Sequence, residues 1–233
     1  MTTPAALSGR DLTRVFPTPS GDVHALTDVS LEVRPGELLV VRGPSGSGKT
    51  TLLNLLGGLD TPTAGEVWIG ETELTAMSEP QLLEVRRTRL SYIFQSFGLI
   101  PVLSAAENVE VPLRLVSTPA DDRERRVIAA LDLVGLAPHA NQRPYELSGG
   151  QQQRVGIARA LVSEPEILIA DEPTGQLDSA TAATVMDLLS ALVHDRGLAA
   201  VVSTHDPLLM RRADRVLELH DGRAQAPGRH RAV

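Results

Sequence analysis

Hydrophobic and polar positions follow a strand-like period in the first third of the chain. Apolar and polar residues alternate over 29–33, which predicts a half-buried strand, and the short segment 65–70 predicts another. The unbroken apolar run at 38–41 predicts a strand buried on both faces. A helical pattern over 49–56 ends at Gly57. We therefore expect the first third to be largely antiparallel.

The middle of the chain carries helical signals. Ser78 and Gln81 have the spacing of a capping box, which predicts a helix start. Asp121 or Asp122 is predicted to cap a later helix, whose apolar positions share one face. We expect the residues from about 96 to 163 to form an inserted helical lobe.

Strands and helices alternate in the last third. Residues 167–170 and 198–203 are predicted strands, with a helix from about 179 to 194 between them. Asp206 is expected to begin a further helix, and 216–223 is expected to form a hairpin. Such alternation predicts a parallel sheet with helices on its faces.

Length and composition exclude several classes of protein. The 233 residues suit one large domain or two small lobes, and the absence of cysteine excludes a disulfide framework and thiolate metal sites. No stretch approaches the roughly 18 consecutive apolar residues that a membrane span needs. The first eight residues lack the pattern of a secretory signal. The net charge of −7 argues against a nucleic-acid partner.

One segment matches the phosphate-binding loop pattern in full, between a predicted strand and a predicted helix. It consists of Gly43, Pro44, Ser45, Gly46, Ser47, Gly48, Lys49 and Thr50. Its glycines let backbone N–H groups turn inward around phosphate oxygens, at the start of a helix. Lys49 would reach the β- and γ-phosphates, and Thr50 would ligate Mg²⁺. Lys49 is the only lysine among 22 basic residues, as expected where a compact ammonium is needed.

Two carboxylates end the apolar strand predicted at 167–170. Asp171 at the strand tip would hold Mg²⁺ through water, and Glu172 would polarise an attacking water. Acids at strand ends are common, so this pattern gains its meaning from the phosphate loop in the same chain.

A second glycine-containing helix start lies about 100 residues further on. In Leu147-Ser148-Gly149-Gly150-Gln151, Ser148 and Gln151 have capping-box spacing, and the two glycines leave N–H groups exposed. The segment therefore predicts a second anion site, which a simple kinase does not need.

Three single residues carry weaker signals, each with a structural alternative. Gln95 could touch Mg²⁺ and water through its amide, or could be ordinary surface. His205 follows the last predicted parallel strand, where ligands gather, but a structural histidine there is also common. Phe16 could stack on adenine or belong to a core.

The ordered set of motifs resembles the nucleotide-binding subunit of an ATP-binding cassette (ABC) transporter, over essentially the whole chain to about Arg223. The resemblance runs through the Walker A loop at 43–50, the Q-loop at Gln95, the signature at 147–151, the Walker B strand at 167–172, the D-loop at 175–178 and the switch histidine His205. Residues 94–101 and 170–175 are most similar to the branch of macrolide exporters and lipoprotein-releasing systems.

Two positions depart from that branch. Gln176 stands where Asn is usual, and Phe16 stands where Tyr is common, which keeps a stacking ring but removes a hydroxyl. Glu172 is intact, so we expect an active ATPase.

The resemblance implies an α/β fold with a P-loop NTPase core. The core would hold a mainly parallel sheet, preceded by an antiparallel β-subdomain and interrupted by an α-helical subdomain at about 96–163. A single ABC ATPase domain would span 1–223, and 224–233 would be a flexible tail.

The resemblance also implies ATP and Mg²⁺ as ligands and assigns roles to residues. Catalysis would fall to Glu172, His205 and Lys49, and Mg²⁺ would be held by Thr50, Gln95 and Asp171. Besides the loop itself, the nucleotide contacts would be Phe16, Thr51, Gln95, Ser148, Gly149, Gly150 and Gln151.

In the family fold the signature faces away from its own phosphate loop. Two copies would therefore meet head to tail and bury two ATP molecules, with Lys49 of one copy facing Ser148 of the other. A permease subunit would supply the membrane part, which implies a place at the cytoplasmic face of the inner membrane without direct insertion.

Two alternatives stay open from sequence. The same ATPase could transmit force to a membrane protein for cell-envelope regulation without transport. A small-molecule phosphotransferase would use the first loop alone, would transfer phosphate to an acceptor, and would form no ATP-dependent dimer.

Overall fold

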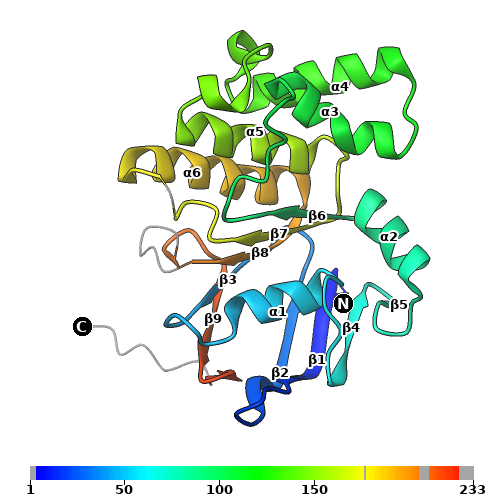
Figure 1. The fold of residues 1–233 in the computed structure, drawn as a ribbon, viewed down its shortest axis with the longest axis vertical. Coiled ribbons are helices and arrows are strands. Elements are labelled where there is room, and N and C mark those ends of the chain that lie inside the picture. Colours follow the sequence, from blue (N-terminus) through cyan, green and yellow to red (C-terminus); the bar gives the residue numbers. More distant parts are fainter. Residues whose placement is uncertain (1–3, 176, 205–209, 226–233) are drawn as a thin grey trace.

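The computed structural model describes residues 4–175, 177–204 and 210–225. Within these residues, the chain forms a four-stranded sheet in the order β2-β1-β4-β5 and a six-stranded sheet in the order β10-β9-β3-β8-β7-β6. In Figure 1 the six-stranded sheet lies across the middle, a layer of helices covers one face, and α1 separates its other face from the four-stranded sheet. This arrangement confirms the expected α/β class.

The four-stranded sheet is antiparallel, as expected. Its strands are β1 (Leu7–Phe16), β2 (Val23–Val33), β4 (Ala64–Ile69) and β5 (Thr72–Glu73). Alternation in the sequence predicted the end of β2 and most of β4. It missed β1, whose register shifts between Gly9 and Leu12 and again beyond Leu12, so that the period of two is interrupted.

The six-stranded sheet is parallel except at its β10 edge. Its strands are β3 (Leu38–Arg42), β6 (Leu90–Ile93), β7 (Ile167–Asp171), β8 (Ala199–Ser203), β9 (Arg215–His220) and β10 (Arg223–Ala224). The predicted strands at 38–41, 167–170 and 198–203 are present, and the predicted hairpin is the antiparallel pair β9–β10.

The helices are α1 (Lys49–Leu56), α2 (Glu79–Thr88), α3 (Ala105–Leu115), α4 (Ala120–Leu133), α5 (Gly149–Leu161) and α6 (Ser179–Arg196), with short 3₁₀ turns η1 (Ala137–His139) and η2 (Pro144–Glu146). The capping box of Ser78 and Gln81 is present at the start of α2. The prediction that Asp121 or Asp122 caps α4 is wrong. Pro119 holds the N-cap position, and both aspartates lie in the first turn, where a negative charge is stabilised by the helix dipole.

The core strands of the parallel sheet divide their side chains between two hydrophobic clusters. On β7, Leu168 and Ala170 join the cluster under the helical layer, whereas Ile167 and Ile169 join the cluster around α1 and the antiparallel sheet. Successive side chains of a strand point to opposite faces, so a strand covered on both faces must be apolar at every position. This packing explains the unbroken apolar runs.

His194 joins the end of α6 to the start of β3 through Asp214. Its Nε2 lies 3.1 Å from Asp214 Oδ2, and the same carboxylate accepts a hydrogen bond from Leu38 N at 2.8 Å. Hydrogen bonding to Asp214, helped by the Ser190 carbonyl and the charge of Asp195, raises the pKa of His194. The charged imidazole therefore stabilises the fold below its unfolded pKa, and this contribution is lost as the pH rises through the raised pKa.

We expect His194→Gln to lower the melting temperature by about 1–3 °C near pH 5, and by less at about pH 8, because this half-exposed pair is screened by solvent. Thermal melts of both proteins at the two pH values test this. The control is His220→Gln, since His220 also faces an aspartate, Asp221 at 3.1 Å, but joins only adjacent residues. Equal losses at both pH values for His194→Gln would refute the assignment.

Candidate functional site

A cleft of about 690 Å³ opens at the carboxyl ends of β3 and β7. Ligands of open α/β sheets gather at this edge. Its walls come from the start of β2, the glycine-rich loop and the ends of β6 and β7. The lining residues are Val23, His24, Ala25, Gly43, Pro44, Ser45, Gly46, Gly48, Lys49, Thr50, Thr51, Gln95, Asp171 and Glu172. The fold thus brings together predicted site residues that are more than 100 positions apart.

The glycine-rich loop wraps around the start of α1. Gly48, the N-cap of α1, has φ 98°, and a Cβ there would collide with the Ala25 carbonyl oxygen, so only glycine fits. The Lys49 side chain is 8% exposed, and its Nζ donates to Gly43 O at 2.8 Å and Pro44 O at 3.1 Å. The loop therefore holds a cation and a helix N-terminus at one end of the cleft, an arrangement suited to phosphate. Ser47 is buried beneath the loop and does not line the cleft.

Asp171 is held between two hydroxyl groups at the tip of β7. Ser203 Oγ donates to its Oδ1 at 2.5 Å, and Thr50 Oγ1 donates to its Oδ2 at 2.9 Å. Asp171 is 9% exposed. The burial of Tyr92, together with the negative charge of the neighbouring Asp171, raises the pKa of Tyr92. The carboxylate and the Thr50 hydroxyl are hard oxygen donors at contact distance, the donor set that Mg²⁺ prefers.

Glu172 turns out of β7 into the cleft. Its φ of 44° lies in the left-handed region, which is uncommon for a residue with a side chain and is often found at functional sites. Ser203 fixes this turn, because Glu172 N donates to Ser203 Oγ at 2.9 Å and to Ser203 O at 3.1 Å. Gln95 Nε2, from the end of β6, lies 3.4 Å from Glu172 Oε2. Gln95 and Glu172 therefore meet beside Asp171.

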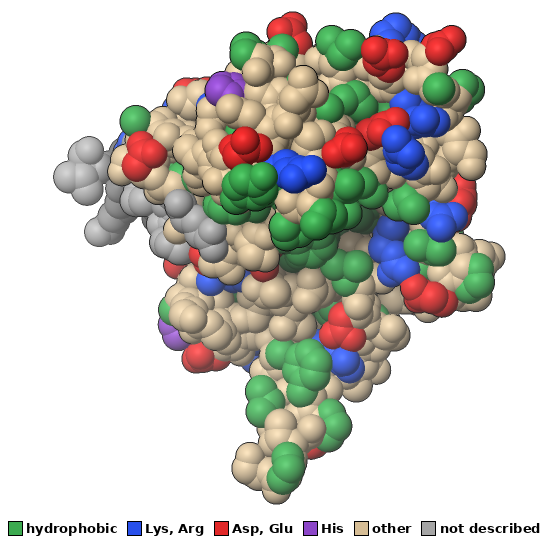
Figure 2. Space-filling model, turned by 45° about the horizontal axis from the view of Figure 1, so that its top comes forward, with side chains coloured by type: hydrophobic (Ala, Val, Ile, Leu, Met, Phe, Trp, Pro, Cys, Tyr) green, Lys and Arg blue, Asp and Glu red, His purple; other side chains and the backbone are tan. Residues whose placement is uncertain are grey.

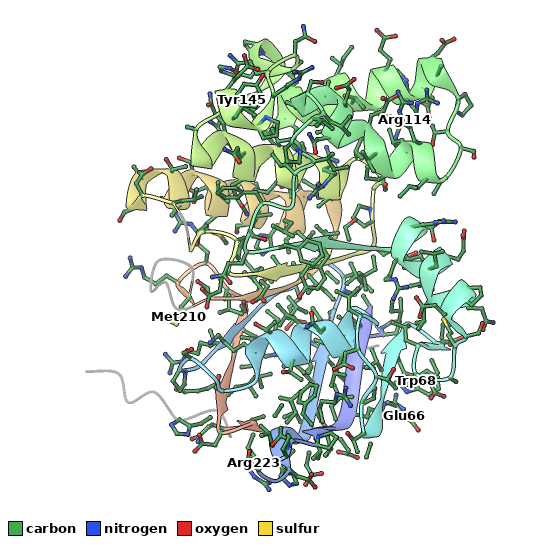
Figure 3. All side chains as sticks on the ribbon, viewed as in Figure 1. Glu66, Trp68, Arg114, Tyr145, Met210 and Arg223 are labelled. Atoms are coloured by element: carbon green, nitrogen blue, oxygen red, sulfur yellow. The ribbon has the colours of Figure 1, made fainter. Side chains whose placement is uncertain are left out.

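The helix start at Ser148 is built as its sequence predicted, but it lies outside this cleft. Ser148 Oγ accepts a hydrogen bond from Gln151 N at 3.3 Å, and Gln151 Oε1 accepts one from Ser148 N at 2.8 Å. None of the residues 148–151 lines the cleft. Tyr145, labelled in Figure 3, precedes this turn and is 74% exposed. The chain thus has two separate glycine-lined helix starts.

The ABC transporter family profile matches residues 26–175. A lipoprotein-releasing system ATP-binding protein, LolD of Pseudomonas fluorescens, is 45% identical over 95% of this chain and 98% of its own. The macrolide export ATP-binding/permease protein MacB of Agrobacterium fabrum is 46% identical over 91% of this chain and 33% of its own. The chain belongs to the ABC transporter family. It is an ATP-binding and ATP-hydrolysing subunit of that family, in the branch that the motifs indicated.

Solved structures agree with this family. The ATP-binding cassette MJ0796 of Methanocaldococcus jannaschii has a dimeric post-hydrolysis structure with bound ADP and Pi. It superposes with a TM-score of 0.88 at 40% identity, over 94% of this chain and 97% of that one. In the described part of this ABC subunit, no helix combines the length and the hydrophobicity of a membrane-spanning segment.

The D-loop of this ABC subunit leads into a helix start that abuts the signature. Asp178 caps α6 by accepting hydrogen bonds from Ala180 N, from Thr181 N and, at 2.6 Å, from Thr181 Oγ1. The Thr181 hydroxyl is also the main reason that the pKa of Asp178 is lowered. Any Cβ at Gly150 would collide with Thr181 Cγ2. The glycine of the signature therefore allows the two helix starts to pack together.

Some predicted residues lie elsewhere. Phe16 ends β1 beside Val23 and does not line the cleft, and Arg14 covers one face of its ring at 4.3 Å from the centroid. Asp60 holds Arg14 in place through two hydrogen bonds, at 2.8 and 2.9 Å. His205 and Gln176 lie outside the described residues.

Sequence reasoning missed the wall formed by Val23 and His24. These residues begin β2, and only the fold brings the start of that strand beside the glycine-rich loop. A lone histidine without ligand spacing gave no reason to single out His24.

Proposed function

We propose that this ABC subunit drives export or extraction of a substrate through a membrane-spanning permease, and that it acts as a head-to-tail dimer held by ATP. One observation carries the dimer: Ser148 caps a helix start suited to anions, yet it does not line the cleft that holds Lys49. A chain with two separate anion sites needs a second copy if both are to bind one phosphate group. The names of the relatives LolD and MacB support transport.

Within one copy, the glycine-rich loop and Lys49 bind the β- and γ-phosphates. Thr50 and Asp171 fit Mg²⁺, because their oxygens already lie 2.9 Å apart, and Gln95 adds an amide oxygen at the same edge of the cleft. The bound ion supplies positive charge to the β- and γ-phosphate oxygens. Ser203 orients the Asp171 carboxylate through its short hydrogen bond.

Glu172 is the general base of hydrolysis in this proposal. Its carboxylate orients a water and accepts its proton as the water oxygen bonds to the γ-phosphorus. The bond from that phosphorus to the β–γ bridging oxygen breaks, and ADP leaves with the electron pair. Gln95 holds the Glu172 carboxylate, and His205, outside the described residues, is proposed to contact the γ-phosphate.

The second copy completes the site. Its Ser148 hydroxyl and the exposed N–H groups at Gly149 and Gly150 face the γ-phosphate of the first copy, and the positive end of the α5 dipole adds to this attraction. Loss of the γ-phosphate removes the group that joins the copies, so hydrolysis releases the dimer. The proposed ABC domain spans 1–223, with the helical subdomain at about 96–163.

A hydrophobic surface is available for the permease. Figure 2 shows hydrophobic side chains gathered in a band between the helical layer and the rest of the molecule. In the segment after β6, Phe94, Ile100 and Val102 are exposed, Val102 to 72%. Patches of this kind mark protein–protein contacts. We propose that the permease binds here and holds the subunit at the cytoplasmic face of the inner membrane, which a pull-down from detergent-solubilised membranes would test.

The experiment that tests the dimer is Ser148→Arg. A bulky cation at the helix start blocks the partner's γ-phosphate, so we expect ATP hydrolysis to fall by about 100-fold or more, while ATP still binds the isolated chain. Steady-state phosphate release and equilibrium nucleotide titration measure the two quantities.

The matched control is Ser104→Arg. Ser104 caps α3 with the same kind of capping box in the same helical layer. It does not belong to the signature, and the proposed mechanism gives it no role. This change should cost about 1 kcal/mol of stability and leave hydrolysis near the parent rate. Normal hydrolysis by Ser148→Arg, or an equal loss in Ser104→Arg, would overturn the role of the signature.

A further inference from the structure

The segment that follows Gln95 is attached to the signature helix by an arginine. Arg159, on α5, donates from Nη1 to Gly98 O at 2.5 Å and from Nη2 to Phe97 O at 3.1 Å. Both acceptors belong to a tight turn, in which Phe97 has φ 34° and Gly98 has φ 61°. Arg159 therefore fixes two consecutive carbonyl groups, two and three residues after Gln95.

The Phe97 side chain lies against the signature itself. A Cβ built on Gly149 would lie 3.7 Å from Phe97 Cζ, and one built on Gly156 would lie 3.3 Å from Phe97 O. The Phe97 ring therefore lies next to the first residue of α5, and the Phe97 carbonyl lies next to Gly156, so that a side chain at either glycine would touch Phe97.

The environment of Arg159 indicates that its guanidinium holds the Phe97–Gly98 turn against α5. Burial lowers its pKa, and among the described residues it forms no ion pair. Its donors are used on backbone carbonyls instead, for which the planar fork of a guanidinium is suited. Hydrogen bonds from a charged, partly desolvated donor are the strong ones.

The other end of this segment reaches the cleft. Gln95 meets Glu172 at 3.4 Å, beside Asp171 and the glycine-rich loop. Within one chain, a short path therefore joins the nucleotide cleft to the signature: Gln95, then the Phe97–Gly98 turn, then Arg159 and Gly149 on α5.

We propose that Arg159 and Phe97 are positioning residues that make the signature helix follow Gln95, so that the nucleotide site of a chain sets the orientation of the Ser148 end that it offers to a second copy. This inference rests on the proposed function, because it assumes that the signature completes the partner's site. Neither residue lines the cleft, so neither is needed for ATP to bind one chain.

The test compares two arginines of the same helix in a Glu172→Gln parent, whose ATP-dependent dimer is measured by light scattering across a range of protein concentrations. Arg159→Met should weaken dimerisation by about tenfold or more, while ATP affinity of the single chain changes less than about twofold. Arg154→Met is the control, because Arg154 donates to the Val134 carbonyl, at 3.1 Å, which does not lead to the cleft. It should dimerise like the parent.

A double-mutant cycle with Gln95→Ala separates positioning from a general loss of stability. If Arg159 acts through Gln95, Arg159→Met should weaken dimerisation much less once Gln95 is replaced. Arg159→Lys, which keeps a charged donor, should recover part of the loss. If Arg159→Met fails to fold, Phe97→Leu removes the ring contact with Gly149 without removing a charge, and it should weaken dimerisation in the same direction.

The outcomes are distinct. A parent that stays monomeric with ATP contradicts the proposed function itself. A parent that dimerises, together with an Arg159→Met variant that dimerises equally well, overturns only this inference. Equal losses in Arg154→Met, or additive losses in the cycle with Gln95→Ala, also overturn it, because they indicate a helical layer that is merely less stable.

Discussion

Glu172→Gln is expected to stop ATP turnover and to accumulate an ATP-held dimer. The amide has nearly the shape of the carboxylate but cannot accept the proton of the attacking water, so hydrolysis should fall by about 100- to 10,000-fold. ATP binding should persist, because Lys49, Thr50 and the glycine-rich loop are unchanged. Since dissociation is proposed to follow loss of the γ-phosphate, the dimer should become long-lived. Single-turnover phosphate release and light scattering with ATP measure both effects.

The same strand offers a matched control. Glu166, directly before β7, pairs with Arg89 at 2.8 Å and does not line the cleft. Glu166→Gln should therefore hydrolyse ATP at the parent rate and dimerise to the same extent as the parent. A Glu172→Gln protein that is monomeric with ATP at all protein concentrations would contradict the dimer proposal. Normal turnover by Glu172→Gln would instead remove Glu172 from the role of general base.

Much of the parallel core was predictable because its physical requirements are local. β3, β7 and β8 are covered on both faces, which demands apolar residues in sequence and makes the runs visible. The glycine-rich loop was equally visible, since a backbone cradle at a helix start tolerates few residue types. The capping boxes at Ser78 and Ser148 were read correctly for the same reason: each is complete within four residues.

Features that depend on tertiary contacts were not predictable in this way. β1 is interrupted by bulges, and β6 is only four residues long, so neither has a clear period. The start of α4 was assigned to an aspartate, although Pro119, with its fixed φ, takes the N-cap position. The Arg14–Asp60 pair and the approach of Phe97 to Gly149 join distant parts of the chain, and no local pattern marks such pairs.

The candidate site shows the same division. The order of the motifs gave the residues of the cleft, but only the fold shows that Ser203 holds both Asp171 and Glu172, through hydrogen bonds of 2.5 and 2.9 Å. Ser203 lies on β8, next to β7, and Ser203 itself carried no sequence signal of chemistry. A parallel neighbour therefore orients the two carboxylates on which the proposed mechanism depends.

Lys49→Ala is expected to abolish tight ATP binding, with an affinity about 100-fold or more weaker than that of the parent. Nζ is enclosed by the loop, at 2.8 and 3.1 Å from two of its carbonyls, and carries the charge that is proposed to face the β- and γ-phosphates. Lys49→Arg should weaken ATP binding almost as much. Lys49 is 8% exposed, and a planar guanidinium is too wide for the enclosed space that its ammonium occupies. Equilibrium titration with a fluorescent nucleotide measures each affinity.

The control for charge alone is Arg42→Ala. Arg42 ends β3 one residue before the loop and pairs with Glu218 at 2.8 Å, but it does not line the cleft. If general positive charge attracted ATP, removing Arg42 would weaken binding as removing Lys49 does. We expect Arg42→Ala to bind ATP within about threefold of the parent, because the charge of Arg42 is already paired with Glu218 and partly exposed to solvent. Parent-like affinity in Lys49→Ala would show that the loop backbone and the α1 dipole suffice, and the ammonium would lose its proposed role.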